Sequence, residues 1–285
     1  MTPGGSTRAP RSEVKPITSL QNDRIKAIRA LDMRKTRKET GLFVAEGASL
    51  IVTAREQGHV PETLVYRAGS AGEGIARGLV TWALENGVEV LEVTEAILEK
   101  LAAKDNPQSV LAVFKQRWAE PPVVAKLKPP STWVALEEIR DPGNLGTILR
   151  TVDAAGAGGI VLVGTCCDPF ARETIRATMG SIFAVPLVRM DRESFLQLCR
   201  EWPGDIVGTH LSATSDFRKV SYRGPTLLVM GSEGPGLSQA LAATCTQLVK
   251  IPMAGRLDSL NLAVATALTL FEIRGPHLSL DRQRP

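Results

Sequence analysis

Short apolar runs alternate with segments of helical periodicity along most of this chain. In the first half, runs typical of strands occur at 42–45, 63–66, 88–93 and 110–114. Apolar residues recur every three or four positions between them, which indicates helices at about 47–57, 73–86 and 94–103. This order predicts an α/β sandwich of about a hundred residues, a common domain size.

A second alternation fills the C-terminal half. Strands are expected at about 132–137, 159–163, 183–188, 205–209, 226–230 and 247–251. Helical segments separate them, and the last helix is expected to begin near Leu260. Strands that alternate with helices in this way predict a mostly parallel sheet covered on both faces.

A proline-rich stretch separates the two alternations. Residues 118–131 contain Pro121-Pro122 and Pro129-Pro130, which is typical of a stiff linker. We therefore expect a smaller domain at 16–117 and a larger one at 132–275. The polar ends predict a disordered tail at 1–15 and a polar tail at 276–285.

Composition places the chain among soluble globular proteins. It has 285 residues, of which 44% are hydrophobic, and a net charge of only +4. No apolar stretch is long enough to span a bilayer, and the N-terminus lacks the apolar core of a signal peptide. The four cysteines (Cys166, Cys167, Cys199 and Cys245) form no CxxC pair. We therefore expect reduced thiols, no metal, no membrane partner and a cytoplasmic location.

Positive charge is concentrated near the N-terminus. The basic cluster consists of Arg24, Lys26, Arg29, Arg34, Lys35, Arg37 and Lys38. Such clusters neutralise phosphates, which favours nucleic acid as a partner. A solvated helix face explains the charge equally well, because Ile25, Ile28 and Leu31 are spaced to bury the opposite side. Charge alone leaves both interpretations open.

Three polar motifs each follow a predicted strand of the C-terminal half. They are Asp141-Pro142-Gly143-Asn144 running into Arg150, Gly231-Ser232-Glu233-Gly234-Pro235-Gly236, and Ile251-Pro252-Met253 followed by Ser259-Leu260-Asn261. Loops at the carboxyl ends of parallel strands bind ligands in open α/β sheets. The glycine motif lacks the lysine of a P-loop, and no dinucleotide fingerprint is present. The motifs therefore predict one binding site of another kind.

Each motif residue also has a plain structural explanation. Asn144 and Ser259 are suitable helix N-caps, and the glycines suit a tight turn. Arg150 alone is most simply a solvated arginine. Asn261 is a poor helix former in a first turn, and Glu233 at the centre of a glycine loop suits a cationic or hydroxyl-bearing ligand. These alternatives stay open for each residue taken singly.

Taken together, the motifs resemble those of the SpoU (TrmH-like) RNA 2′-O-ribose methyltransferases of the SPOUT superfamily. The residues that carry the resemblance are Asp141 to Gly146 with Ile148 to Thr151, Gly231 to Ser238, and Ile251 to Met253 with Ser259 to Asn261. The first half more weakly resembles the family's L30e-like substrate-binding domain, through Ile17 to Asn22, Phe43 to Gly47 and Asn106 to Gln108. Ser109 departs from the glycine that family members often have there.

The resemblance implies a trefoil-knotted, mostly parallel sheet and methyl transfer from S-adenosylmethionine to a ribose 2′-hydroxyl. By the same resemblance, the cofactor would be bound by Gly231, Ile251 and Leu260, with Thr209 and Leu211 as lesser candidates. The catalytic residues would be Asn144, Arg150, Glu233, Ser259 and Asn261. Because arginine almost never gives up its proton, we expect Arg150 to hold a phosphate and stabilise developing alkoxide charge.

The resemblance also implies partners. They are an RNA bound through the basic cluster and a second copy of the chain in a homodimer. 23S ribosomal RNA is the first expectation, since the two-domain architecture resembles the ribosomal members of the family, whereas tRNA members often lack the first domain. A tRNA substrate and a non-catalytic RNA-binding or ribosome-assembly protein remain alternatives. A resistance methyltransferase that acts on large-subunit RNA shares the architecture.

Overall fold

The computed structural model describes residues 13–71, 74–102 and 108–280, which form two compact units. Unit 1 contains the chain up to Gln116 together with Phe170–Arg176, and unit 2 contains Arg117–Pro169 and the chain from Ala177 onward. The expected domain boundaries did not include this exchange of a short segment. Residues 1–12 of the tail expected at 1–15, residues 281–285 of the tail expected at 276–285, and Asn106-Pro107 of the weaker resemblance lie outside the described residues.

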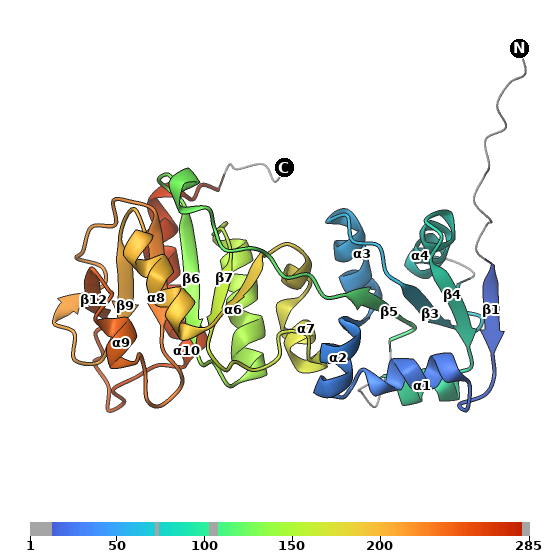
Figure 1. The fold of residues 1–285 in the computed structure, drawn as a ribbon. Helices are drawn as coiled ribbons and strands as arrows, with labels where there is room; N and C mark the ends of the chain where they lie inside the picture. The colour runs from blue at the N-terminus through green and yellow to red at the C-terminus, as the bar shows by residue number, and fades with distance from the viewer. Residues whose placement is uncertain (1–12, 72–73, 103–107, 281–285) are drawn as a thin grey trace, which may run out of the picture. The chain divides into compact units, whose positions relative to one another are not determined.

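Unit 1 is built on a five-stranded mixed sheet with the order β1-β4-β3-β5-β2 (Figure 1). The strands are β1 (Val14–Ile17), β2 (Leu42–Glu46), β3 (Thr63–Arg67), β4 (Glu89–Val93) and β5 (Val110–Lys115). The first three strands of that order are mutually parallel, whereas β5 is antiparallel to β3 and β2. The expected strands are therefore present, with ends that differ by a residue.

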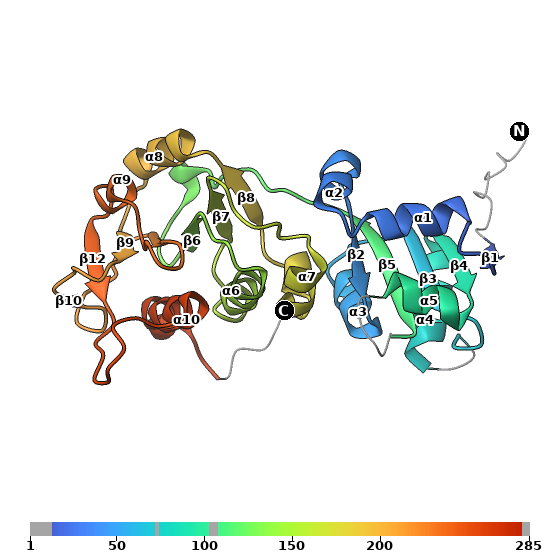
Figure 2. The ribbon, with the colours of Figure 1, turned by 90° about the horizontal axis from the view of Figure 1, so that it is seen from below.

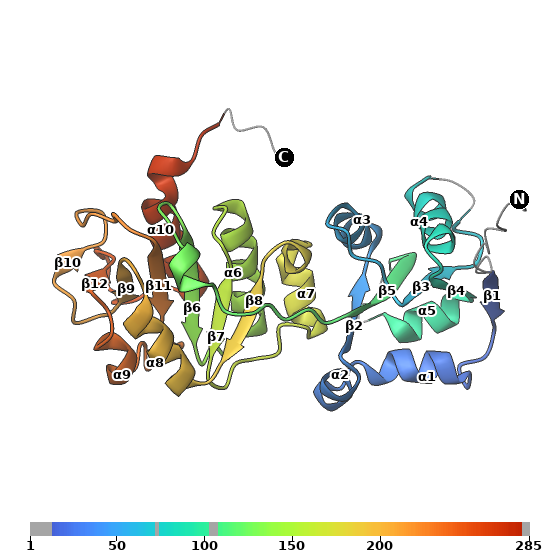
Figure 3. The same cartoon turned by 45° about the horizontal axis from the view of Figure 1, so that its top comes forward.

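Two helix pairs cover the faces of this sheet. The helices are α1 (Asp23–Ala30), α2 (Arg34–Thr40), α3 (Ala48–Glu56), α4 (Gly74–Glu85) and α5 (Glu95–Leu101). Helix α1 packs beside α5 on one face, and α3 packs beside α4 on the other (Figure 3). The core beneath α1 and α5 contains Ile25, Ile28, Leu91 and Val113. The apolar side of α1 is therefore buried against the sheet, as the spacing of Ile25 and Ile28 indicated, while the basic residues of the helix lie on its other side.

The expected tail at 1–15 is wrong at its C-terminal end. Val14 and Lys15 belong to β1 and pair with Val90 and Leu91 of β4. Only Ile17 of this strand is buried, so it lacks the apolar alternation that reveals a strand in the sequence.

Unit 2 has a seven-stranded sheet whose strands are all parallel, in the order β10-β12-β9-β11-β6-β7-β8. They are β6 (Thr132–Glu137), β7 (Ile160–Val163), β8 (Leu187–Met190), β9 (Ile206–Thr209), β10 (Ser215–Asp216), β11 (Thr226–Met230) and β12 (Gln247–Lys250). The predicted parallel sheet is confirmed. The strand expected at 183–188 begins only at Leu187, because Ser181–Phe183 forms a 3-10 turn whose apolar side chains are also buried.

Helices lie on both faces of this second sheet. Helices α6 (Pro142–Ala154) and α10 (Leu262–Arg274) pack together on one face, and α8 (Arg192–Glu201) and α9 (Gln239–Ala242) lie on the other (Figure 2). Helix α7 (Arg172–Thr178) begins in the segment that belongs to unit 1. Two further 3-10 turns are Val124–Lys126 and Gly275–His277. Among the described residues, no helix has the length and apolar character needed to cross a bilayer.

The proline-rich stretch is partly packed on unit 2. The Ala119 amide donates to the Leu187 carbonyl at 2.7 Å, so the chain runs beside β8. Val124 and Leu127 pack against the core under α8. This stretch therefore covers part of the sheet as well as connecting the two units.

Candidate active site

The three polar motifs meet at one edge of the parallel sheet. They follow β6, β11 and β12, and the loop after β9 joins them there because all these strands point the same way. A pocket of about 730 Å³ lies at this edge. Its lining includes all five predicted cofactor-binding residues, namely Thr209, Leu211, Gly231, Ile251 and Leu260.

The glycine motif forms a tight loop that folds back on its own first residue. The Gly236 amide donates to the Ser232 carbonyl at 3.0 Å, and the two residues form an isolated β-bridge. A Cβ on Gly231 would lie 2.0 Å from the Gly236 carbonyl carbon, so only glycine fits there. The loop therefore presents backbone N–H and C=O groups to the pocket at close range.

A directed chain of hydrogen bonds joins the three motifs. Asn261 Oδ1 accepts the amides of Ala263 and Val264 at 2.9 and 3.3 Å, which fixes the orientation of its side-chain amide. Its Nδ2 then donates to Asn144 Oδ1 at 2.9 Å. Asn144 Nδ2 donates in turn to Glu233 Oε1 at 2.8 Å. The helix cap at Asn261 thus determines the direction of every bond in the chain.

The helix caps differ from those expected. Helix α6 is capped by Asp141, whose carboxylate accepts the Asn144 amide at 2.6 Å, so Asn144 is not the N-cap and its side chain is available to the hydrogen-bonded chain. Helix α10 is capped by Asn261 and not by Ser259. Ser259 instead donates its hydroxyl to Asp258 at 3.3 Å and lines the pocket.

Arg150 is the one predicted catalytic residue that the fold of the described chain does not bring into this cluster. Its side chain is exposed on α6, and it does not line the pocket. Within the described parts of the chain, no hydrogen bond or ion pair joins it to Asn144, Glu233 or Asn261.

A cysteine lies close to these polar groups. Burial raises the pKa of the Cys167 thiol to about 12, and the charges of Cys166, Glu233 and Asp141 act in the same direction. The thiol is therefore protonated at neutral pH and is no nucleophile there.

One residue near the site was missed from the sequence. Glu137 ends β6 with only 4% of the residue exposed, and its Oε2 accepts the Ser238 amide at 2.8 Å. The signal available was an acidic residue that ends an otherwise apolar strand. Such a residue needs partners when it is buried, and the sequence does not say which.

The basic cluster is only partly available to an RNA. Arg37 must be removed from the predicted phosphate-binding residues, because it is buried and its Nη1 donates to the carbonyls of Leu31 and Asp32 at 2.7 and 2.9 Å. Arg24 lies 3.3 Å from the Glu89 carboxylate, which offsets its charge. The other members are exposed on α1 and α2: Lys26, Arg29, Arg34, Lys35 and Lys38.

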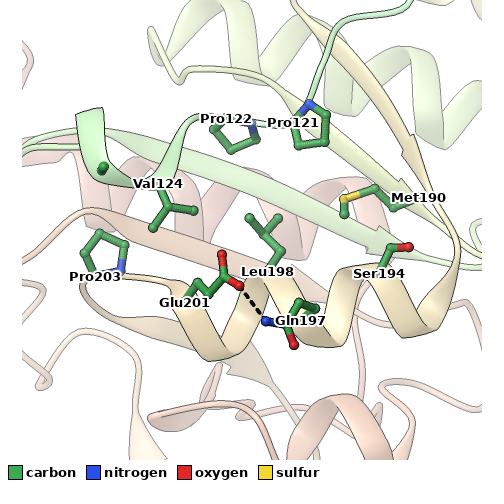
Figure 4. Close-up of a pocket in the computed structure, with 10 residues that line it drawn as sticks. Pro121, Pro122, Val124, Met190, Ser194, Gln197, Leu198, Glu201 and Pro203 are labelled. Atoms are coloured by element: carbon green, nitrogen blue, oxygen red, sulfur yellow. Dashed lines mark hydrogen bonds between the residues drawn. The ribbon is translucent and has the colours of Figure 1, made fainter.

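A second hollow of about 720 Å³ lies between the proline-rich stretch and α8 (Figure 4). Its walls include Pro122, Met190 and Leu198, and a hydrogen bond joins Gln197 to Glu201 at its rim. None of the motif residues lines this hollow. It therefore offers no chemistry comparable to that of the glycine-loop pocket.

Comparison with known proteins identifies both units. Residues 131–271 match the SpoU rRNA Methylase family, and residues 22–112 match the MRM3-like substrate binding domain. A solved AdoMet-bound rRNA methyltransferase from Sinorhizobium meliloti is 45% identical, with a TM-score of 0.85 over 93% of this chain and 99% of that one. The SpoU methyltransferase AviRb of Streptomyces viridochromogenes, solved with AdoMet, is 29% identical over 90% and 98% of the two chains, with a TM-score of 0.78.

Two proteins that are related in sequence are also named as RNA methyltransferases. A 23S rRNA (uridine(2479)-2′-O)-methyltransferase of Streptomyces viridochromogenes is 30% identical over 85% of each chain. The 23S rRNA (guanosine(2553)-2′-O)-methyltransferase RlmP of Bacillus subtilis is 28% identical over 92% of this chain and all of its own. Fold and site thus define an RNA methyltransferase with a parallel α/β catalytic unit. The chain belongs to the SpoU rRNA methylase family.

Proposed function

We propose that this protein transfers a methyl group from S-adenosylmethionine to a ribose 2′-hydroxyl of 23S ribosomal RNA. The observation that carries the proposal is the hydrogen-bonded chain from Asn261 through Asn144 to Glu233, which places a carboxylate at the rim of the glycine-loop pocket. The relatives from Streptomyces viridochromogenes and Bacillus subtilis, which are named for 2′-O-methylation of 23S rRNA, support the choice of RNA.

The pocket suits the proposed cofactor. Small-molecule sites typically measure about 300–1,000 Å³, and this pocket falls in that range at about 730 Å³. Its backbone groups at Gly231 can bind a polar ligand closely, and Met230, Ile251 and Leu260 offer apolar contact. S-adenosylmethionine supplies an electrophilic methyl group, so the protein has chiefly to align the ribose oxygen with it.

The hydrogen-bonded chain would position the ribose. Asn144 holds Glu233 Oε1, and among the described residues Glu233 Oε2 has no hydrogen-bond partner. Oε2 is therefore available to accept a hydrogen bond from the hydroxyl that becomes methylated. Arg150, exposed on α6, would hold the target phosphate and stabilise developing charge on the ribose oxygen.

The role of Arg150 can be tested with Arg150→Lys. Lysine retains the positive charge but not the planar, bidentate geometry of guanidinium. We expect a large loss of kcat with little change in the pH–rate profile. Near-full activity of the lysine variant would contradict the proposed geometry.

We also propose that two copies form a homodimer through α10. Val264, Leu268 and Phe271 are 48%, 43% and 43% exposed and lie along one side of the helix, while α10 packs on α6 with another side. Such an apolar stripe is typical of an interface. Leu268→Glu should shift the mass measured by light scattering from dimer to monomer, whereas a monomeric wild-type protein would contradict the proposal.

Two further properties stay predictions. The first is a cytoplasmic location: within the described residues none of the four cysteines is joined in a disulfide, in keeping with the reducing compartment where the proposed ribosomal RNA is found. The trefoil knot implied by the family is the second.

The decisive experiment is methyl transfer from labelled S-adenosylmethionine to total RNA that lacks this modification. We expect label in RNA of 23S size, with ribose methylation at one nucleotide, and none with Glu233→Gln. Label in the tRNA fraction would identify tRNA as the substrate instead. Cofactor binding without any transfer, to naked RNA or to ribosomal assembly intermediates, would instead support a non-catalytic RNA-binding protein.

A further inference from the structure

Glu137 occupies an unusual place for a carboxylate. It is the last residue of β6, whose other residues are all buried, and only 4% of it is exposed. Strand β6 pairs with β11 in a register that sets Leu136 opposite Met230, so Glu137 lies beside the start of the glycine loop at Gly231. A buried charge is costly unless partners hold it, so its contacts are informative.

Both carboxylate oxygens of Glu137 have partners. Oε2 accepts the Ser238 amide at 2.8 Å, and Oε1 lies 3.3 Å from Nη2 of Arg192, the first residue of α8. Ser238 is the second residue after the glycine motif, which ends at Gly236. One side chain thus joins the two ends of the loop, since it starts beside Gly231 and holds the backbone at Ser238.

The segment from β6 to α6 therefore holds the glycine loop at three points. These are the strand pairing at Leu136, the Glu137 contact with Ser238 and the Asn144 contact with Glu233. Glu137 is not among the residues that line the pocket. We propose that Glu137 is a positioning residue that keeps the glycine loop in the shape that binds the methyl donor. This inference rests on the proposed function, because it takes S-adenosylmethionine as the ligand.

The test compares two substitutions at this position. Glu137→Met fills a similar volume but leaves the Ser238 amide without an acceptor, whereas Glu137→Gln keeps an acceptor. A hydrogen bond to a charged group contributes enough that we expect the methionine variant to bind S-adenosylmethionine about tenfold or more weakly by calorimetry. The change in kcat at saturating cofactor should be much smaller, and the glutamine variant should recover most of the affinity.

A second pair of variants covers the case in which Glu137→Met does not fold. Ser238 has φ −63°, close to the value that proline requires, so Ser238→Pro removes the donor N–H without forcing the backbone there. Ser238→Ala is its matched control, because it loses only the hydroxyl that caps the Leu241 amide. We expect Ser238→Pro, but not Ser238→Ala, to weaken cofactor binding.

Glu138→Gln is the control for the loss of a negative charge beside Arg192, because Glu138 also lies 3.3 Å from that residue. The Ser238 amide donates to Glu137 and not to Glu138, so this control leaves the contact with the glycine loop intact. Wild-type affinity in the folded Glu137→Met and Ser238→Pro proteins, with only the unfolding temperature lowered, would overturn the inference. Wild-type protein that binds no S-adenosylmethionine would instead overturn the proposed function, so the two failures are distinguishable.

Discussion

Asn261 combines two roles in one side chain, and the two can be separated. Its Oδ1 caps α10 and its Nδ2 donates to Asn144. Asn261→Asp should keep the cap and hold stability within about 0.5 kcal/mol, because aspartate is as good an N-cap as asparagine. It removes the donor, however, and sets a carboxylate oxygen against Asn144 Oδ1. We expect turnover to fall about tenfold or more in single-turnover methyl transfer.

Asn261→Ala is the comparison for that experiment. Alanine loses the cap as well as the donor, so stability should also fall, by about 1 kcal/mol in thermal unfolding. An aspartate variant with wild-type turnover would show that the direction of the hydrogen-bonded chain is irrelevant to catalysis.

The Cys167 thiol gives a second prediction for a single residue. Burial raises its pKa from 9.0 to about 12, so at pH 8 the thiolate is about a thousandfold rarer than in the unfolded chain. We expect iodoacetamide to alkylate Cys167 at least about a hundredfold more slowly in the native protein than in urea, as measured by mass spectrometry. Equal rates in the two states would show that the Cys167 thiol is accessible to the reagent in the folded protein.

The same pKa shift determines how the stability of the folded state changes with pH. The folded state binds the proton more tightly than the unfolded state, so the stabilising contribution of Cys167 is fully present below about pH 9. It is lost as the pH rises toward about 12. Cys167→Ala should therefore show a shallower loss of stability than the wild type over that alkaline range.

Helix α2 carries two neighbouring basic residues, of which one stabilises the fold and the other is free to contact RNA. Arg37 is buried and holds the corner between α1 and α2, whereas Lys38 is exposed. Arg37→Met should lower the free energy of unfolding by about 1–3 kcal/mol, because two carbonyls lose a charged donor. Lys38→Met should leave stability unchanged. It should instead reduce the slope of log affinity for RNA against log salt by about 0.7–0.9.

Filter binding at several salt concentrations, together with urea unfolding, checks both variants. If Arg37→Met reduced the salt slope while stability stayed the same, the guanidinium would be a phosphate ligand after all.

The sequence predicted most elements because their apolar residues repeat regularly. The strands expected at 132–137 and 226–230 have those bounds in the structure. Strand β1 was missed because three of its four residues are not buried, and β10 because it has only two residues. A strand held mainly by backbone pairing at a sheet edge leaves little hydrophobic signal.

The candidate site was predictable for a different reason. Polar motifs that follow apolar strands stand out, which drew attention to Asn144, Glu233 and Asn261, whereas their catalytic roles were implied only by the resemblance to the SpoU methyltransferases. The helix caps could not be placed as reliably, because neighbouring residues such as Asp141 and Asn144 are both good caps and backbone geometry decides between them. The partner of Glu137 depends on strand register and is invisible in the sequence.

In the whole molecule, the two units do not follow the linear order of the chain. Phe170–Arg176 lies within the stretch that matches the SpoU family, yet it packs as part of unit 1. The Phe170 ring lies 5.0 Å from that of Phe43, and Arg172 pairs with Asp32. A domain boundary drawn from a proline-rich stretch cannot reveal such an exchange, because it depends on contacts distant in sequence.

This exchange predicts that unit 1 depends on a residue about fifty positions beyond its apparent end. Phe170 is 3% exposed and extends an aromatic cluster in which the rings of Phe43 and Phe114 lie 5.9 Å apart. Phe170→Ala should destabilise unit 1 by about 3–5 kcal/mol, the usual cost of deleting a buried phenyl ring. Hydrogen exchange should therefore accelerate in the amides of β2 and β5.

Phe271→Ala is the matched control, because that ring is 43% exposed on α10 and should leave exchange in β2 and β5 unchanged. If Phe170→Ala also left these amides protected, unit 1 would be stable without the exchanged segment. If the prediction holds, residues 13–116 expressed alone should unfold at a lower temperature than the same residues within the intact chain, because the isolated fragment lacks the ring that Phe43 packs against.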